Sequence, residues 1–291
     1  MSEFTCTLAS VHAYPIKSCG GVTLHEGLLI ETGLELDRAW MVVDRRGDML
    51  TQREWPRMAL VQCTLKSSEL VLRAPGMLTL HLRLDTVEEA TDAQVWNDRV
   101  KAYDMGDLAG QWFTDFLQPG ARSRNAGLRL VRFDPDHLRA CDPQWTGALP
   151  AQTAFADAYP LLVANTASLQ DLNRRLAAAG AAPVEMQRFR PNLVLDGLPA
   201  FDEDHTLDLF IQTPQGEAEL RLVKPCVRCS ITNIDPATAQ SSPAVGDTLA
   251  TYRVDPRVGG AVTFGMNAVV VRGLEHTLQA GQAVRGRIAF A

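Results

Sequence analysis

Residues 223–232 of this 291-residue chain read VKPCVRCSIT and hold two of its six cysteines, three positions apart. The residues just before Pro225 have the pattern of a strand, and Pro225 should end it because proline cannot donate a backbone hydrogen bond. We therefore expect a loop at a sheet edge that presents both thiols, Cys226 and Cys229. The guanidinium of Arg228, directly before Cys229, favours the thiolate form that binds metals or attacks disulfides.

Four kinds of site are compatible with this cysteine pair. A zinc site needs four ligands, and His137 and Cys141 are the candidate partners. A dithiol of the thioredoxin type usually opens a helix, whereas residues 231–234 have the pattern of a strand. The cysteines could also be two small buried hydrophobic residues, or one thiolate could bind a metal other than zinc while the second supports it.

Basic residues recur near the ends of predicted strands elsewhere in the chain. Lys17 and Ser18 lie in a turn whose lysine, hydroxyl and glycine amides can hold an oxyanion. Three arginines occupy similar positions, and each alone fits an ordinary surface residue. They are Arg38, Arg53 and Arg190. Together with Lys17 and Arg228, they predict a positively charged cleft that binds an anionic cofactor.

Short strands separated by turn residues dominate the first hundred residues, and no helical segment of ordinary length precedes about residue 107. Periodic apolar residues predict one helix over 107–117 and another over 167–179. The remainder of the second half again shows short strands and turns. We therefore predict a mostly β protein of the α+β class with a few helices. The small polar stretch 120–125 divides it into domains 1–125 and 126–291.

Composition places the chain among globular proteins, with 46% hydrophobic and 21% charged residues. A net charge of -6 argues against general nucleic-acid binding. The first ten residues lack the basic and apolar regions of a signal peptide, and no stretch approaches the ~20 apolar residues of a membrane span. Scattered cysteines in a chain of ordinary size are typical of a reducing compartment, so we expect a cytoplasmic protein.

A series of short motifs, in order along nearly the whole chain, carries a family resemblance. They read YPIKS at 14–18, DRAW at 37–40, TQR at 51–53 with PR at 56–57, FADAYP at 155–160, FRPN at 189–192, PCVRC at 225–229, TNIDP at 232–236 and FGMN at 264–267. With these motifs the chain resembles MOSC-domain proteins that carry an N-terminal MOSC β-barrel domain. That group includes mitochondrial amidoxime-reducing components and their bacterial relatives. The resemblance implies an N-terminal β-barrel-like domain followed by a MOSC β-barrel domain.

The resemblance implies a molybdenum cofactor, in which a pyranopterin dithiolene with a phosphate holds the metal, and not pyridoxal phosphate. The second cysteine of the pair, Cys229, matches the family's protein ligand to molybdenum, which makes it the implied metal ligand and catalytic residue. The implied cofactor-binding residues are Lys17, Ser18, Arg38, Arg53, Asp157, Arg190, Asn192, Arg228 and Cys229. Reductase members often have Thr and Ser after the aspartate, whereas this chain has Ala158 and Tyr159.

The implied function is that of an oxidoreductase that reduces small N-hydroxylated substrates by oxygen-atom transfer to cysteine-ligated molybdenum. Electrons would come from a separate flavin or iron–sulfur reductase, because this chain lacks the cysteines of the ferredoxin domain that some bacterial relatives carry. One alternative is a molybdenum-cofactor carrier or sulfur-transfer protein with a persulfide on Cys226 or Cys229. Another is a binding module stabilised by zinc on His137 and Cys141.

Overall fold

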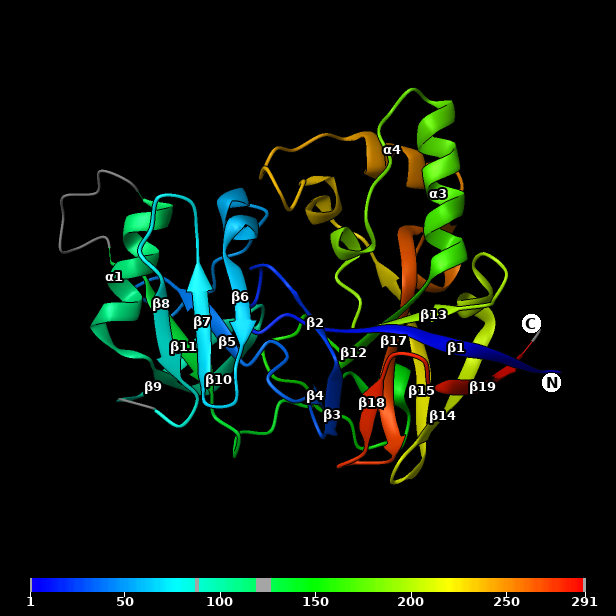
Figure 1. The fold of residues 1–291 in the computed structure, drawn as a ribbon, viewed down its shortest axis with the longest axis horizontal. Helices are drawn as coiled ribbons and strands as arrows, with labels where there is room; N and C mark the ends of the chain where they lie inside the picture. Colours follow the sequence, from blue (N-terminus) through cyan, green and yellow to red (C-terminus); the bar gives the residue numbers. More distant parts are fainter. Residues whose placement is uncertain (1, 87–88, 119–126, 290–291) are drawn as a thin grey trace.

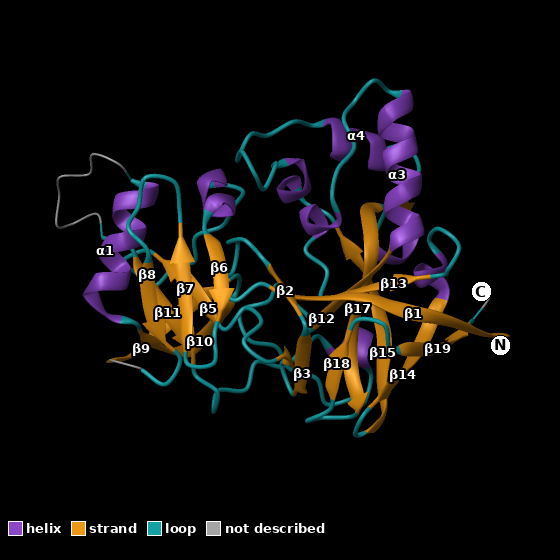
Figure 2. Ribbon diagram, in the orientation of Figure 1, coloured by secondary structure: helices purple, strands orange, loops and turns teal. Residues whose placement is uncertain are grey.

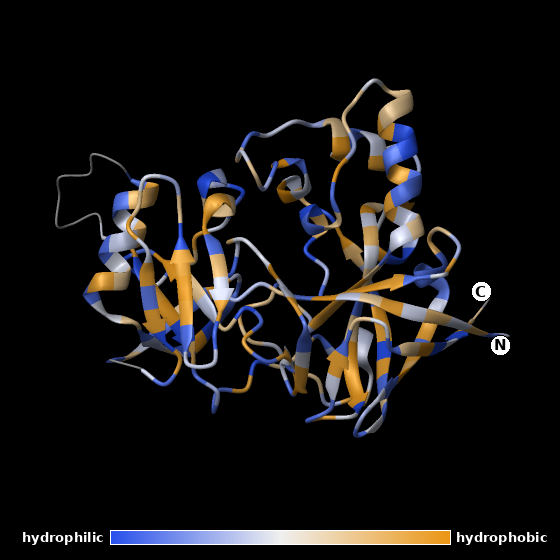
Figure 3. Ribbon diagram, viewed as in Figure 1, coloured by the Kyte–Doolittle hydropathy of each residue, from blue (hydrophilic) through white to orange (hydrophobic). Residues whose placement is uncertain are grey.

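The computed structural model describes residues 2–86, 89–118 and 127–289. Two β-rich halves lie side by side, and both chain ends lie at the larger half (Figure 1). The prediction of a mostly β protein with a few helices is confirmed (Figure 2). Hydrophobic residues run along the strands of both halves (Figure 3).

The larger half is a closed barrel of seven strands. Their order is β12-β13-β1-β19-β14-β15-β17, and pairing between β12 and β17 closes the ring. In β15 the alternating residues Ala218, Leu220 and Leu222 are buried in the core, as expected for a barrel strand. The barrel strands are β1 (Ser2–Ala13), β12 (Leu161–Asn165), β13 (Leu193–Asp196), β14 (Thr206–Thr213), β15 (Gly216–Val227), β17 (Ala261–Arg272) and β19 (Ala283–Ile288), extended by β2 (Val22–Leu24) and β16 (Val254–Asp255).

The smaller half contains a four-stranded sheet, a three-stranded sheet and a covering helix. Trp40 from the first sheet and Phe113 and Phe116 from the helix are buried in its core. The first sheet is β5 (Trp40–Val43), β11 (Arg129–Phe133), β10 (Asp98–Asp104) and β9 (Glu89–Val95), in that order, and the second is β6 (Gln62–Leu65), β7 (Glu69–Arg73) and β8 (Leu80–Arg83). A further small sheet belongs to the larger half, where Leu29, Leu34 and Leu278 lie in the barrel core. It consists of β18 (Thr277–Gln279), β3 (Glu26–Ile30) and β4 (Gly33–Leu34).

The first strand joins the start of the chain to the larger half. β1 pairs with β13 on one side and with β19 on the other, and both of these come from the second half of the sequence. The stretch expected to separate two domains, 120–125, lies outside the described residues. The division into 1–125 and 126–291 therefore stays a prediction.

The helices are few and short. Both predicted helices are present within one residue of their expected ends, as α1 (Gly106–Leu117) and α3 (Thr166–Ala178). The others are α2 (Pro143–Thr146) and α4 (Ala244–Ala250), with 3-10 helices η1 (Pro56–Leu60), η2 (Met186–Phe189), η3 (Asp202–His205), η4 (Ser230–Asn233) and η5 (Pro256–Val258). In the described parts of the chain, no helix has the length and apolar character needed to cross a bilayer.

Two local predictions around the cysteine pair are wrong. β15 does not end before Pro225 but continues to Val227, and its register with β17 shifts on either side of the proline. Such bulges are positions where a strand tolerates proline, because ladder hydrogen bonds are already interrupted there. Residues 231–234 do not continue as a strand either, since η4 occupies Ser230–Asn233.

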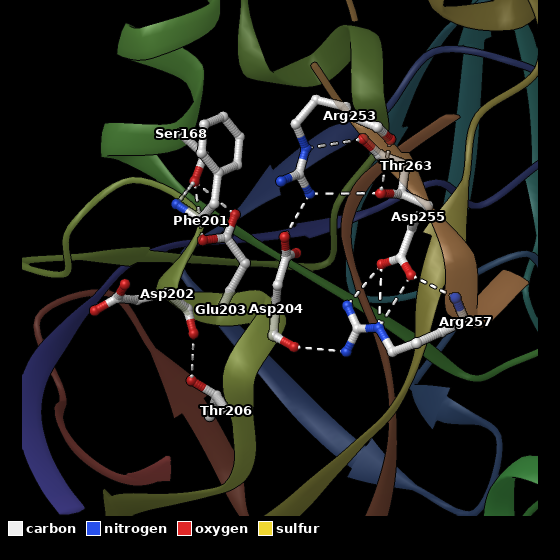
Figure 4. A network of polar contacts seen from close by, with 10 residues as sticks. All are labelled: Ser168, Phe201, Asp202, Glu203, Asp204, Thr206, Arg253, Asp255, Arg257 and Thr263. Atoms are coloured by element: carbon white, nitrogen blue, oxygen red, sulfur yellow. Dashed lines mark hydrogen bonds and ion pairs between the residues drawn. The ribbon is translucent and has the colours of Figure 1, made fainter. Parts of the chain in front are cut away.

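A buried polar network anchors η3 against the barrel (Figure 4). The Glu203 carboxylate accepts hydrogen bonds from the Ser168 hydroxyl at 2.7 and 2.9 Å. The next residue, Asp204, pairs with Arg253 at 2.5 Å. Burial, reinforced by the neighbouring carboxylate of Asp204, raises the pKa of Glu203 from 4.5 to about 7.

Glu203 should make stability fall as pH rises through the acidic range. The carboxyl keeps its proton to a higher pH in the folded protein than in the unfolded chain. The free energy of unfolding therefore falls between pH 4.5 and about 7 and stays lower above that range. We expect Glu203→Gln to remove this dependence and to raise the free energy of unfolding at pH 8 by about 3 kcal/mol. Urea denaturation from pH 4 to pH 8 measures the free energy of unfolding of both proteins. If it depends on pH in the same way in the variant and in the unmodified protein, the prediction is wrong.

Candidate cofactor-binding site

All residues that the sequence predicted to bind a cofactor line one cleft. They are Lys17, Ser18, Arg38, Arg53, Asp157, Arg190, Asn192, Arg228 and Cys229. They come from the loop after β1, the segments around β5, the segment before β12, the end of η2 and the end of β15. Five of them are cationic and one, Asp157, is acidic, so the cleft is positively charged in a chain whose net charge is -6. Such a cleft concentrates anions.

The two thiols of the pair differ in their surroundings. Cys229 is exposed and Cys226 is half-buried, and both are free. Arg228 donates from Nη1 to the Cys226 sulfur at 2.9 Å and from Nη2 to the Phe189 carbonyl at 2.9 Å. The guanidinium thus contacts Cys226 and leaves the Cys229 thiol open to an incoming ligand. Its Nε is buried and has no partner among the described residues.

Tyr14 separates two of the arginines. Its ring lies 4.4 Å from the guanidinium carbon of Arg38 and 4.3 Å from that of Arg190. A Cβ on Gly21 would come within 2.4 Å of this ring, so only glycine leaves room for it. Burial outweighs the nearby positive charges and raises the pKa of the Tyr14 hydroxyl to about 12. Tyr14 belongs to the motif YPIKS, but nothing in the residues around it indicates this role.

Three cleft residues have left-handed backbone conformations. The φ angles are 68° for Ser18, 47° for Arg38 and 59° for Arg190. Outside glycine, this region costs free energy and is retained where the surroundings enforce it, commonly at functional sites. Here it turns side chains of three separate segments into one cleft.

Arg38 is held by several acceptors. Its Nη1 donates to both carboxylate oxygens of Asp37, at 2.8 and 2.6 Å, and to Asn192 Oδ1 at 3.1 Å. Its Nη2 donates to the Arg190 carbonyl at 3.0 Å. By contrast, Arg190 uses Nη1 for the Cys19 carbonyl at 2.6 Å, and its buried Nη2 has no partner in the described part of the chain. Arg190 therefore has a donor available for a bound anion.

Lys17 and Asp157 form an ion pair across the cleft. Lys17 Nζ lies 2.5 Å from Asp157 Oδ1 and donates to the Phe155 carbonyl at 2.8 Å. Burial alone would raise the pKa of Asp157, but the attraction and hydrogen bond of Lys17 outweigh it and hold that pKa well below its usual range. Asp157 is thus ionised, and it neutralises Lys17 locally.

Arg139 supports the segment that carries Asp157, a role sequence analysis did not anticipate. Its side chain is buried and donates to the carbonyls of Ala154, Ala156 and Asp157 at 2.9, 2.6 and 3.1 Å. Its Nε pairs with Asp98 of the smaller half at 2.7 Å. No local sequence signal distinguishes Arg139 from a surface arginine, because its partners are backbone carbonyls of a distant loop.

Trp96 lies at the edge of the cleft and not in a core. It occupies the tight turn between β9 and β10 with a φ of 55° and is 38% exposed. Its Nε1 donates to Asp157 Oδ1 at 3.2 Å, and its ring faces the guanidinium of Arg53 at 4.4 Å. The indole therefore orients an acidic and a basic residue of the cleft.

Replacing Trp96 should weaken both contacts in steps. Trp96→Phe keeps the ring over Arg53 but loses the N–H to Asp157, and we expect it to lower the free energy of unfolding by about 1 kcal/mol. Trp96→Ala also loses the cation–π contact and should cost about 2 kcal/mol. Urea denaturation tests the order. An alanine variant as stable as the unmodified protein would show that the indole contacts contribute nothing.

Two of the alternative interpretations of the cysteine pair are wrong. In the described residues, no group of three or more potential ligands is placed to hold a metal ion, so the zinc set with His137 and Cys141 is wrong. Cys141 is buried beside Tyr159 and Val269 in a separate cluster. Since Cys229 is exposed, the reading of two buried hydrophobic residues is wrong too.

Comparison with known proteins matches almost the whole chain. Residues 5–119 match the MOSC N-terminal beta barrel domain, and residues 150–285 match the MOSC domain. Mitochondrial amidoxime reducing component 2 of Rattus norvegicus is 36% identical over 266 residues, which cover 87% of this chain and 74% of that protein. Mitochondrial amidoxime-reducing component 1 of Homo sapiens is 34% identical over 257 residues, covering 85% and 72%. A solution structure from Bordetella bronchiseptica is 30% identical and covers 43% of this chain and 89% of its own, with a TM-score of 0.33, too low to support a structural argument.

Proposed function

Because the chain belongs to the family of MOSC-domain proteins with an N-terminal MOSC β-barrel domain, which includes the amidoxime-reducing components, we propose that it is a molybdenum-cofactor-dependent oxidoreductase acting on small N-hydroxylated compounds. One observation carries the proposal. An exposed thiol, Cys229, stands at a cleft lined by five cationic residues. A soft thiolate suits a thiophilic metal, and guanidiniums suit a phosphate.

The residues present fit this cofactor. Buried donors without partners among the described residues, Arg190 Nη2 and Arg228 Nε, are what an anionic ligand would satisfy. Cys229 would bind the metal. The cofactor's phosphate and pterin would be held by the remaining residues, namely Lys17, Ser18, Arg38, Arg53, Asp157, Arg190, Asn192 and Arg228. When bound, the cofactor would supply the two-electron redox chemistry.

The chain's own residues would bind and orient. Asp37 and Asn192 hold the Arg38 guanidinium in place, and the Tyr14 ring keeps it apart from that of Arg190. Such fixed cations bind an anion without reorganisation. Because Cys229 is exposed, a metal bound to it would be accessible to a substrate from solvent. The proposal includes a separate flavin or iron–sulfur electron donor, and a cytoplasmic location, which six free thiols favour.

Ala158 and Tyr159 stand where the reductases that this chain resembles often have Thr and Ser. Both line the cleft; Tyr159 also packs with Cys141 and Val269, and its buried hydroxyl has no partner among the described residues. Because Ala158 offers no hydroxyl, the phosphate would depend more on Ser18 and the arginines. This is a property of the present chain that phosphate-affinity measurements can compare with its relatives.

Metal and pterin analysis tests the proposal. We expect protein from molybdate-supplied cells to contain molybdenum and a pterin that fluoresces after oxidation, in near-equal amounts, and to reduce an aromatic amidoxime with a chemical reductant. Stoichiometric zinc with neither molybdenum nor pterin would refute it.

A cofactor carrier or sulfur-transfer protein is the second candidate. The observation that favours it is a second thiol in the cleft, Cys226, whose sulfur accepts a hydrogen bond from Arg228. A persulfide there would be stabilised by the same guanidinium. Mass spectrometry distinguishes the two candidates, because added sulfur on Cys226 or Cys229 in protein without molybdenum supports transfer.

A further inference from the structure

A second pocket adjoins the cofactor cleft on the far side of Arg190. It has a volume of about 390 Å³, within the range typical of small-molecule sites. It shares Arg190 and Ile231 with the cleft but does not include either cysteine of the pair. Because glutamine side chains line it, we name it the amide pocket. It is defined by Tyr14, Gln52, Gln62, Gln187, Arg188 and Arg190.

Buried polar atoms without partners concentrate on this pocket. In the part of the chain that the structure describes, the Tyr14 hydroxyl, Gln52 Oε1 and Arg188 Nε are buried and make no hydrogen bond, in addition to Arg190 Nη2, which is assigned above to the anion of the cleft. Tyr14 and Gln52 are only 1% and 3% exposed. An unpaired buried polar atom is costly, so three such atoms at one pocket indicate that a ligand supplies their partners.

The unpaired atoms define the chemistry of that ligand. Gln52 Oε1 requires a donor, Arg188 Nε requires an acceptor, and the Tyr14 hydroxyl can serve either. The Arg188 charge is already paired with Asp235 at 3.4 Å, and Glu185 adds a carboxylate to the lining opposite the charge of Arg190, which favours a neutral ligand over an anion. Ile231, Ile234 and Pro236 supply an apolar wall suited to the face of a flat molecule.

We propose that the amide pocket is a second binding site, which takes a neutral, planar compound with adjacent N–H and C=O groups, such as a cyclic amide. The site goes beyond the proposed redox function and does not require molybdenum. Arg190 lies between the two sites, and its guanidinium is held on one side by the Tyr14 ring. A ligand in the amide pocket and an anion in the cleft would therefore both be next to Arg190, the residue through which the two sites are linked.

Uracil tests the proposal, because it carries N–H beside C=O, and 1,3-dimethyluracil is its matched control without donors. We expect saturable uracil binding to the full chain in ligand-observed NMR, and binding of the dimethyl compound about tenfold weaker. Gln52→Leu should weaken uracil binding about tenfold, and Arg188→Lys, which keeps the charge but removes Nε, should act in the same direction.

Two further variants separate this site from others. Gln212→Leu makes the same change as Gln52→Leu at an exposed position near the end of β14, and it should leave uracil affinity unaltered. Binding should persist in Cys229→Ser, so failure of the molybdenum proposal would not affect the result. Absence of saturable uracil binding, equal affinity for the two compounds, or unchanged affinity in both pocket variants would each overturn the proposal and indicate a pocket filled by water only.

Discussion

Cys229→Ser is expected to remove molybdenum from the protein and to lower amidoxime reduction by more than about 100-fold. Loss of a residue that merely supports a metal ligand typically costs 10–100-fold, and Cys229 is proposed as the ligand itself. Serine matches cysteine in shape but replaces a soft, readily ionised thiol with a hydroxyl that stays protonated. Because Cys229 is exposed, the melting temperature of the cofactor-free protein should not change.

Cys226→Ser is the matched control. It removes the other thiol of the same cleft, whose contact is the guanidinium of Arg228 and not, in our proposal, the metal. We expect this variant to keep its molybdenum, with a smaller loss of activity. Molybdenum per protein, measured by elemental analysis, and turnover with a chemical reductant check both variants. Full metal content and activity in Cys229→Ser would remove Cys229 from the mechanism, and loss confined to Cys226→Ser would exchange the two roles.

The local patterns in the sequence were sufficient for the fold class and the long helices. Period-two alternation, as in Ala218, Leu220 and Leu222, marks a strand with one buried face, whatever it pairs with. The extent of α1 follows from apolar periodicity alone, since its N-cap residue makes no side-chain hydrogen bond. The start of α3 follows from capping as well, because the Asn165 side chain accepts from the backbone N–H of Ala167 at 3.2 Å. These signals are contained within a dozen neighbouring residues.

Features set by distant contacts were not predictable in this way. β15 passes through Pro225 because β17 pairs with it across bulges, and nothing near Pro225 specifies those bulges. The position of Trp96 at the cleft depends on Asp157 and Arg53, which are remote in sequence. The charged side chains of the cleft could be identified as candidate site residues from the sequence motifs. Tyr14 and Arg139, which orient them, could not, because only the tertiary structure brings these two residues close to their partners.

Asn192→Leu should be among the most destabilising single changes at the cleft. Asn192 is 1% exposed. Its Oδ1 accepts from the Leu162 backbone N–H and from Arg38, both at 3.1 Å, and its Nδ2 donates to the His12 carbonyl at 3.1 Å. Leucine has a similar size but leaves these three groups without that partner. We expect the free energy of unfolding to fall by about 3–5 kcal/mol, as measured by urea denaturation.

Asn173→Leu provides the control for the loss of a half-buried amide away from the cleft. Asn173 bridges the backbone of Val184, accepting from its N–H at 2.8 Å and donating to its carbonyl at 2.9 Å. We expect it to cost about 1–3 kcal/mol and to leave phosphate affinity of the cleft unchanged. Asn192→Leu should weaken phosphate binding as well, because Arg38 loses the acceptor that orients it. If both variants lose stability but neither loses phosphate affinity, Asn192 supports the fold without positioning Arg38.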